Sequence, residues 1–281
     1  MNGFPIGILL ESLRLPFPQA LDAARSLGVQ GVQVYATNGE LSPDRLTPAA
    51  KRDFLKQVKD RGLVVSAVCG DLGHGFGDPY QNPMLIGRSK RILDLSKEWE
   101  CGIVTTHIGV VPPDPDHPRY RVMQDACGEL ARYADGIGCR FAVETGPETA
   151  ATLKGFLDSL GSRGVSVNLD PANLVMVTGD DPVRAVHTLK DYIVHTHAKD
   201  GVKLFDKDPE KVYGIVRDDA LVTDHAFSEV PLGEGGVDFP AYLAALREVG
   251  YKGFLTIERE VGDDPAGDIR KAVAFLRGLM G

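Results

Sequence analysis

The segment RFAVETGPETAATLKGFLDSLGSRGVSVNLD, residues 140–170, contains two short strand-like segments, Arg140–Glu144 and Val165–Leu169, with a helical stretch between them. A strand, a helix and a second strand in this order are typical of a parallel βα unit. The same alternation extends in both directions along the chain. The other strands are expected at Phe4–Leu10, Gln30–Tyr35, Leu63–Cys69, Ile103–His107, Tyr192–His197 and Gly253–Glu258.

Helical stretches separate these strands, with apolar residues at steps of three and four. Glycine, which often ends a helix, stands just before the next strand at several places. The helices expected include Pro48–Arg61, Pro83–Glu100, Arg119–Asp135 and Phe239–Val249, and the glycines are Gly28, Gly62, Gly102, Gly138, Gly164 and Gly250.

Eight βα units in 281 residues predict an α/β protein with a single (β/α)₈ TIM-barrel domain over residues 1–281. A doubly wound open sheet is the alternative, but it usually carries a glycine-rich phosphate turn after its first strand. The turn here, GILLESLRLPFP, has none. A long insertion without obvious secondary structure follows the seventh strand, at about 201–236, and such loops are often lids or interface elements.

Composition excludes several classes of protein. Hydrophobic residues make up 43% of the chain, and 31 Lys and Arg face 39 Asp and Glu, for a net charge of −8. That balance argues against a dedicated nucleic-acid or anionic-membrane binder. The four cysteines have neither CxxC nor zinc spacing, so we expect buried thiols in a reducing compartment. We find neither a signal peptide nor a membrane span in the sequence and expect a cytoplasmic protein.

Four strands end in a side chain that could bind a metal: Glu144, Asp170, His197 and Glu258. Alternation along a strand points each of them into the barrel mouth, where active sites of such barrels lie. Their separations of 26, 27 and 61 residues match one βα unit each, with the insertion in the last. A single strand-end acid is as often a solvated residue, but four at equivalent positions predict a mononuclear site. Three carboxylates and one imidazole suit Mn²⁺, Mg²⁺ or Co²⁺, with Zn²⁺ as the alternative.

Other polar residues near the strand ends are weaker candidates. His107 and His195 are expected to point into the mouth and to bind substrate, with a structural histidine as the alternative. Lys199 follows the ligand histidine closely and could contact the substrate or form a loop salt bridge. Glu148 could bind a sugar hydroxyl or simply begin the following helix, where a carboxylate is favoured.

Five segments, in register with the predicted barrel, resemble a known superfamily. They are AVETG (142–146), VNLDPANL (167–174), HTHAKDG (195–201), PLGEGGVDF (231–239) and LTIERE (255–260). Their order and spacing are similar to those of the xylose-isomerase-like superfamily of sugar-phosphate isomerases and epimerases. Within this superfamily, the chain most resembles the group that contains keto-sugar 3-epimerases, hydroxypyruvate isomerases and inosose dehydratases. Endonuclease IV shares the same fold.

The resemblance covers nearly the whole chain and implies the same four metal ligands, with Glu144 and Glu258 also acting as acid and base. Two positions depart from the family pattern. Asn173 stands where many epimerases carry a substrate-binding histidine, and Lys203 stands where an arginine is common, which loses a bidentate contact. Both are retained as candidate substrate-binding residues. The resemblance also implies a dimer or tetramer.

These observations favour a divalent-metal-dependent sugar isomerase or epimerase that transfers a proton through an enediolate of an α-hydroxy-ketone. The first alternative is a dehydratase or lyase acting on a keto-sugar, an inosose or an oxidised glycoside. An endonuclease-IV-like phosphodiesterase is disfavoured by only seven histidines and the charge of −8. A barrel that only binds sugar is the non-catalytic alternative. The expected partner is therefore a small sugar or sugar derivative.

Overall fold

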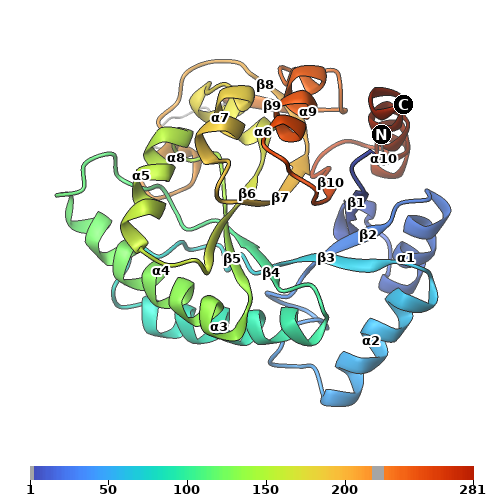
Figure 1. Ribbon diagram of the computed structural model, residues 1–281, viewed down its shortest axis with the longest axis horizontal. Coiled ribbons are helices and arrows are strands. Elements are labelled where there is room, and N and C mark those ends of the chain that lie inside the picture. Colours follow the sequence, from blue (N-terminus) through green and yellow to red (C-terminus); the bar gives the residue numbers. More distant parts are fainter. Residues whose placement is uncertain (1–2, 217–224) are drawn as a thin grey trace.

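The computed structural model, which describes residues 3–216 and 225–281, shows a closed barrel of eight parallel strands surrounded by helices (Figure 1). The strands follow one another around the barrel in the order β1, β10, β7, β6, β5, β4, β3, β2. The predicted TIM barrel is therefore confirmed. Their bounds are β1 Ile6–Leu9, β2 Gly31–Tyr35, β3 Val64–Cys69, β4 Ile103–Thr106, β5 Arg140–Glu144, β6 Val165–Leu169, β7 Ile193–Ala198 and β10 Leu255–Ile257.

The helices bury their apolar faces against the outside of the barrel, in the way that amphipathic helices cover a sheet. Most of them carry a proline at their first or second position, where its fixed φ suits the first turn of a helix. They are α1 Phe17–Ser26, α2 Pro48–Asp60, α3 Asn82–Glu98, α4 Pro118–Ile137, α5 Ala150–Leu160, α7 Pro182–Leu189, α9 Phe239–Glu248 and α10 Pro265–Met280. Short helical turns lie at η1 Leu10–Leu13, α6 Pro171–Asn173, η2 Leu174–Thr178 and α8 Pro209–Val212.

One predicted helix end lies elsewhere. Helix α5 ends at Leu160, and Gly161, with φ +59°, takes the left-handed position after it. Gly164, expected to end this helix, instead lies so close to the carbonyl oxygen of Ala131 on α4 that a Cβ atom would overlap it. The glycine at 164 is thus required by packing between elements and not by the helix end.

The insertion after β7 has secondary structure, contrary to the expectation of a loop without it. Strands β8 (Asp200–Lys203) and β9 (Phe227–Val230) pair antiparallel, and α8 lies between them in the sequence. Part of the predicted 201–236 segment, residues 217–224, lies outside the described residues. Across residues 3–216 and 225–281, the structure contains no helix long and apolar enough to cross a membrane.

Candidate metal centre

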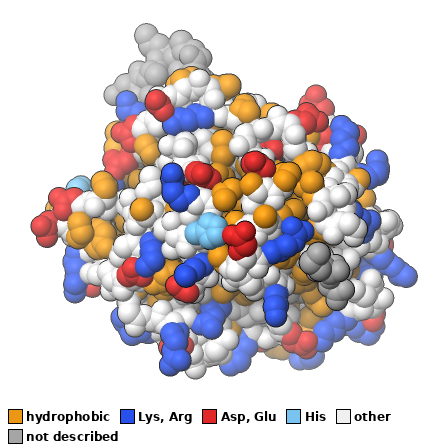
Figure 2. Space-filling view, turned by 45° about the horizontal axis from the view of Figure 1, so that its top comes forward, with side chains coloured by type: hydrophobic (Ala, Val, Ile, Leu, Met, Phe, Trp, Pro, Cys, Tyr) orange, Lys and Arg blue, Asp and Glu red, His pale blue; other side chains and the backbone are white. Residues whose placement is uncertain are grey.

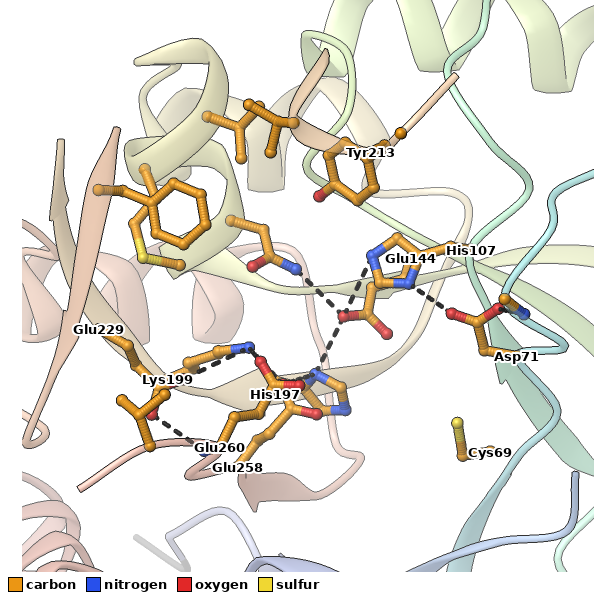
Figure 3. Close-up of a pocket in the computed structure, with 18 of the residues that line it drawn as sticks. Cys69, Asp71, His107, Glu144, His197, Lys199, Tyr213, Glu229, Glu258 and Glu260 are labelled. Atoms are coloured by element: carbon orange, nitrogen blue, oxygen red, sulfur yellow. Dashed lines mark hydrogen bonds and ion pairs between the residues drawn. The ribbon is translucent and has the colours of Figure 1, made fainter. Parts of the chain in front are cut away.

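The strand register brings the four predicted ligands together. Glu144 ends β5 opposite Asn168 of β6, and His197 of β7 lies opposite Thr256 of β10. Asp170 and Glu258 follow β6 and β10 directly. Each of the four ligand residues offers one atom within 4.8 Å of the others, and all four are buried (Figure 3). The cluster could hold a metal ion.

The imidazole of His197 faces the three carboxylates with its Nδ1 atom. This nitrogen lies 3.2 Å from Asp170 Oδ2, 3.3 Å from Glu258 Oε2 and 3.5 Å from Glu144 Oε1. The other nitrogen, Nε2, lies 3.1 Å from Gln33 Oε1, and the Gln33 amide nitrogen donates to Thr105 Oγ1 at 3.1 Å. An Nε2–H that donates to this oxygen leaves a lone pair on Nδ1, which is the form that binds a metal.

Neighbouring donors orient the carboxylates. Asn168 and Asn173 each donate a side-chain N–H to Glu144, at 3.1 Å to Oε2 and 3.2 Å to Oε1. Asp170 accepts from the backbone N–H of Asn173 at 2.9 Å and so caps the turn α6, which leaves its second oxygen toward the centre. Lys199 Nζ donates to Glu258 Oε2 at 3.0 Å. Each carboxylate is therefore held in one orientation before any ligand arrives.

The charges of the cluster act strongly on one another. Burial alone would lower the pKa of His197, but the charges of Glu258 and Glu144 and the hydrogen bond to Asp170 hold it well above its usual value. Burial alone would raise the pKa of Glu258, but His197 and Lys199 hold it well below its usual value. These opposed directions show that the site stabilises a positive charge among its carboxylates.

A divalent ion fits this donor set. Carboxylate oxygens bind such ions at about 2.0–2.2 Å, so ligand atoms on opposite sides of an ion lie about 4.2 Å apart. The spread of 4.8 Å needs only a small inward shift. Three oxygens and one nitrogen favour a hard or borderline cation over a thiolate-seeking metal. The four residues carry three negative charges, and a 2+ ion offsets most of them.

A cavity of about 890 Å³ opens above the cluster, with Glu144, His197 and Glu258 at its floor (Figure 3). His107 lies on its wall, as predicted, and its Nδ1 is 3.1 Å from Asp71 Oδ2. The His107 Nε2 atom is buried without a hydrogen-bond partner among the described residues and lies 3.8 Å from Glu144 Oε1. Burial would lower the pKa of His107, but the charge of Glu144 and the contact with Asp71 raise it to about 9.

Of the other predicted residues, Asn173 and Lys199 also line the cavity, whereas three do not. His195 lies beneath the centre, 1% exposed, with Nδ1 2.8 Å from Asn168 Oδ1 and Nε2 2.8 Å from Thr256 Oγ1. Glu148 is buried behind the wall and accepts from the backbone N–H of Val111 at 3.1 Å. Lys203 forms an ion pair with Asp206 at 2.6 Å, outside the lining. The structure therefore gives both nitrogens of His195 a structural partner.

Several residues of the site were not singled out from the sequence. Asp71 orients His107 from a loop after β3, and Gln33 orients His197 from β2. Tyr213, in the insertion, lies over His107 with ring centroids 5.5 Å apart. Only the DLGHGFG loop around Asp71 carried a local signal, because it is glycine-rich and polar beside a strand end. The other two contacts join elements far apart in the chain.

Gly146 allows the wall next to Glu144 to close. Its φ of +141° lies in a region that side chains rarely adopt. A Cβ atom there would also come within 2.5 Å of the Asn173 Cβ and 2.9 Å of the Tyr213 hydroxyl. The glycine of the AVETG segment therefore lets Asn173 and Tyr213 pack against the end of β5.

Comparisons with known proteins agree with this architecture. The family model described as "Xylose isomerase-like TIM barrel" matches residues 21–279. Among curated proteins, the chain is 28% identical over 170 residues to the rhizopine catabolism protein MocC of Rhizobium meliloti. That match covers 55% of this chain and 48% of MocC, so the chain spans about half of the length of this relative.

Three solved structures are similar over almost the full chain. A xylose isomerase domain protein from Planctomyces limnophilus has a TM-score of 0.80 and 26% identity, covering 99% of this chain and 98% of that one. The probable 3-DHS dehydratase AsbF of Bacillus anthracis has a TM-score of 0.75 and 18% identity. This match covers 97% of this chain and 98% of that one. The 3-keto-D-glucoside 4-epimerase YcjR of E. coli has a TM-score of 0.74 and 18% identity. This match covers 98% of this chain and 99% of that one. The last two show a shared fold.

Proposed function

The chain belongs to the family of xylose isomerase-like TIM barrels, and from this premise we propose that it is a divalent-metal-dependent isomerase or epimerase of a sugar or sugar derivative. The observation that carries the proposal is the buried convergence of Glu144, Asp170, His197 and Glu258, all of which except Asp170 line the cavity. These four residues would hold one Mn²⁺, Mg²⁺ or Co²⁺ ion, with Zn²⁺ as the alternative. When bound, such an ion polarises the carbonyl of an α-hydroxy-ketone and so acidifies the neighbouring C–H.

The proton transfer is the work of two glutamates. Glu144 and Glu258 reach the centre from different strands, and both carboxylates border the cavity. One removes the proton from the carbon next to the carbonyl, which leaves an enediolate, and the other returns a proton. Return to the opposite face of the same carbon gives an epimer. Return to the adjoining carbon, with transfer of a hydroxyl proton between the two oxygens, gives an aldose–ketose isomer. General acid–base catalysis of this kind contributes about 10²–10⁴-fold to the rate.

His107 and Asn173 hold the substrate beside the glutamates in this proposal. The unpartnered Nε2 atom of His107 is aimed at the cavity next to Glu144 and is available to a sugar oxygen. Asp71 fixes the orientation of the ring from the other side. Lys199 forms an ion pair with Glu258 and orients its carboxylate. His195, Glu148 and Lys203 stay predictions as substrate-binding residues.

Loss of water from the same kind of substrate is the second candidate function. Its support is the position of His107, whose buried and unpartnered Nε2 atom lies in the cavity wall, 3.8 Å from Glu144 Oε1. A protonated imidazole in the cavity wall can donate a proton to a departing hydroxyl after a glutamate has removed the C–H proton. The two functions differ in product, since only the second one forms water and an unsaturated carbonyl compound.

The test begins with the metal. Elemental analysis of the purified chain after dialysis against dilute Mn²⁺ is expected to give about one ion per chain in the native protein and less in Glu258→Gln. The loaded enzyme is then incubated with a panel of ketohexoses in D₂O, and exchange of carbon-bound hydrogen is followed by NMR. Exchange is expected to fall at least about 10²-fold in Glu258→Gln and in Glu144→Gln.

Glu248→Gln, at an exposed position on α9, is the matched control and should keep both metal and exchange. Absence of any bound metal, or full exchange in both cavity variants, would refute the proposal. Two or three zinc ions per chain would instead point to phosphodiester hydrolysis, and release of water would select the dehydratase. We also propose a reducing cytoplasmic location, supported by four free cysteine thiols. The dimer or tetramer stays a prediction.

A further inference from the structure

The cavity above the metal centre has two parts of different chemistry. Its floor is formed by the ionisable residues of the centre, whereas its outer wall is largely apolar. Figure 3 shows Tyr213 on the side of the cavity away from Glu258 and Glu260. The outer wall is formed chiefly by Val177, Leu204, Val212, Tyr213, Ile215 and Phe227.

Several of these apolar side chains are open to water. Leu204 is 59% exposed and Ile215 is 39% exposed, and Val261, which also lines the cavity, is 48% exposed. On the face drawn in Figure 2, hydrophobic side chains gather beside acidic and basic ones. Exposed apolar side chains that line a polar cavity are typical of a ligand site, because covering them removes apolar area from water.

The cavity is larger than a bare sugar needs. A hexose has about twelve non-hydrogen atoms, and at the roughly 30 Å³ that a water molecule occupies it needs at most about 360 Å³. The cavity measures about 890 Å³, toward the upper end of the range for drug-sized ligands. A hexose seated on the centre therefore leaves more than half of the volume unfilled, on the side of the apolar wall.

The charges of the lining disfavour a phosphate in that remaining space. Lys199 is the only lysine or arginine among the lining residues that the structure describes. Its Nζ atom is already held by carboxylates, at 3.0 Å from Glu258, 2.5 Å from Glu260 and 3.8 Å from Glu229. Phosphate recognition needs donors that are free to converge on the anion. The lining instead adds further acidic groups, Asp71 among them.

We propose that the substrate is an uncharged keto-sugar that carries an apolar substituent, and that this substituent lies against the outer wall formed by Val177, Leu204, Val212, Tyr213, Ile215 and Phe227. This inference rests on the proposed function for the position of the sugar ring. The insertion after β7 supplies four of these wall residues from 204–215 and Phe227 from β9. The insertion thus sets specificity for the substituent, while the barrel strands carry the chemistry.

The test compares three small ligands by isothermal titration calorimetry on the Mn²⁺-loaded full chain. They are methyl β-D-glucopyranoside, phenyl β-D-glucopyranoside and glucose 6-phosphate. The two glycosides lack the ketone, so they serve as unreactive analogues that differ only in the substituent. The phenyl glycoside is expected to bind about tenfold or more tightly than the methyl glycoside, because its ring is removed from water. Glucose 6-phosphate is expected to bind no more tightly than the methyl glycoside.

Leu204→Ser and Ile215→Ser are expected to lower the preference for phenyl over methyl by several-fold, with little change in folding because both side chains are exposed. Met84→Ser, on α3 and 50% exposed outside the cavity, is the matched control and should leave the preference unchanged. Light scattering on each variant reports whether the apolar wall is instead an interface between copies of the chain.

Equal affinity for the two glycosides, undetectable binding of both at millimolar concentration, or tighter binding of the phosphate would overturn the inference. So would a change of oligomeric state in Leu204→Ser together with an unchanged preference. These outcomes do not depend on turnover. If the protein binds no metal or catalyses no deuterium exchange but still prefers the phenyl glycoside, the proposed reaction is refuted. The assignment of the apolar wall as the site of the substituent then still holds.

Discussion

The amide of Gln33 shows how one residue far from the metal ligands in sequence controls the centre. Its oxygen lies 3.1 Å from His197 Nε2, and its nitrogen is anchored to Thr105. Gln33→Met removes the acceptor and keeps the volume, so His197 loses the partner that selects its tautomer. We expect metal affinity to fall about 10–100-fold, as it does when such supporting hydrogen bonds are removed. Competition with a chelating dye measures it.

Gln57→Met, on the outer helix α2, is the control for this substitution and should bind metal with unchanged affinity. Equal affinity of Gln33→Met and the native protein would show that the imidazole is oriented by the carboxylates alone.

A second residue, Glu148, makes stability depend on pH. Burial raises its pKa to about 8, against the hydrogen bond from Val111, and its Oε1 has no partner among the described residues. The folded protein therefore holds a proton here that the unfolded chain releases near pH 4.5. The associated stability is full below pH 4.5 and is lost as pH rises to about 8. Glu148→Gln, which cannot ionise, should lack this loss.

Urea unfolding at pH 5.5 and 8.5 checks this prediction. The free energy of unfolding of the native protein should fall by up to a few kcal/mol more than that of Glu148→Gln when the pH rises from 5.5 to 8.5, since one pKa unit corresponds to 1.36 kcal/mol. A difference between the two proteins that stays constant with pH would contradict it.

The residues of the centre could be predicted from sequence to different degrees. Glu144, Asp170, His197 and Glu258 were predictable because alternation along a strand is local and its C-terminal end is recognisable. His195 shares the face of His197, but its depth in the barrel depends on the register with β6, including the bulge beside Asn168. No local pattern contains that information, so its burial beneath the centre was not predictable.

At the scale of elements, Asp200 joins the β8–β9 hairpin to the turn before α9. Its carboxylate accepts four backbone N–H groups, those of Gly201, Gly233, Gly235 and Val237, at 2.9–3.1 Å, and the side chain is 1% exposed. Asp200→Ala leaves these donors unpaired. We expect a loss of about 2–4 kcal/mol in the free energy of unfolding.

Chemical denaturation measures that loss, and hydrogen exchange at Gly233 and Gly235 should show faster opening of the turn. Asp200→Asn retains one acceptor oxygen and should cost less than the alanine. If the alanine variant were as stable as the native protein, the turn would be held by contacts other than this carboxylate.

The hairpin itself could not be predicted for a physical reason. Its strands Asp200–Lys203 and Phe227–Val230 are only four residues long and stand 23 residues apart, so no tight-turn signal connects them. The barrel strands were predicted to within about two residues at each end, because glycines and helix periodicity mark their limits. At Gly164 the prediction of a helix end from a glycine was wrong, because close contact with α4 requires that glycine.

For the whole molecule, the alternation of eight strands and helices was enough to predict closure into a barrel, because right-handed parallel connections leave few other arrangements. The shape of the cavity was harder to predict from the sequence. It depends on Tyr213, Ile215 and Phe227 of the insertion, and Tyr213 lies against His107, 106 residues earlier in the chain.

The stability of the whole barrel should respond to the metal. Three buried carboxylates converge on one point, and an ion that binds there and not to the unfolded chain stabilises the fold by RT ln(1 + [L]/Kd). Mn²⁺ at about 100 times its Kd contributes about 2.7 kcal/mol. For a chain of this length that is a rise in Tm of roughly 5 °C. Differential scanning fluorimetry with Mn²⁺ and with EDTA measures it.

Asp170→Asn separates this effect from general ion effects. The variant removes one of the three carboxylate ligands, so it should gain little from Mn²⁺, provided that its hydrogen bond to Asn173 persists. Asp158→Asn, on the exposed face of α5, should gain as much as the native protein. An equal rise in Tm in all three proteins would locate the responding ion outside the barrel mouth, and the four strand-end ligands would then require another explanation.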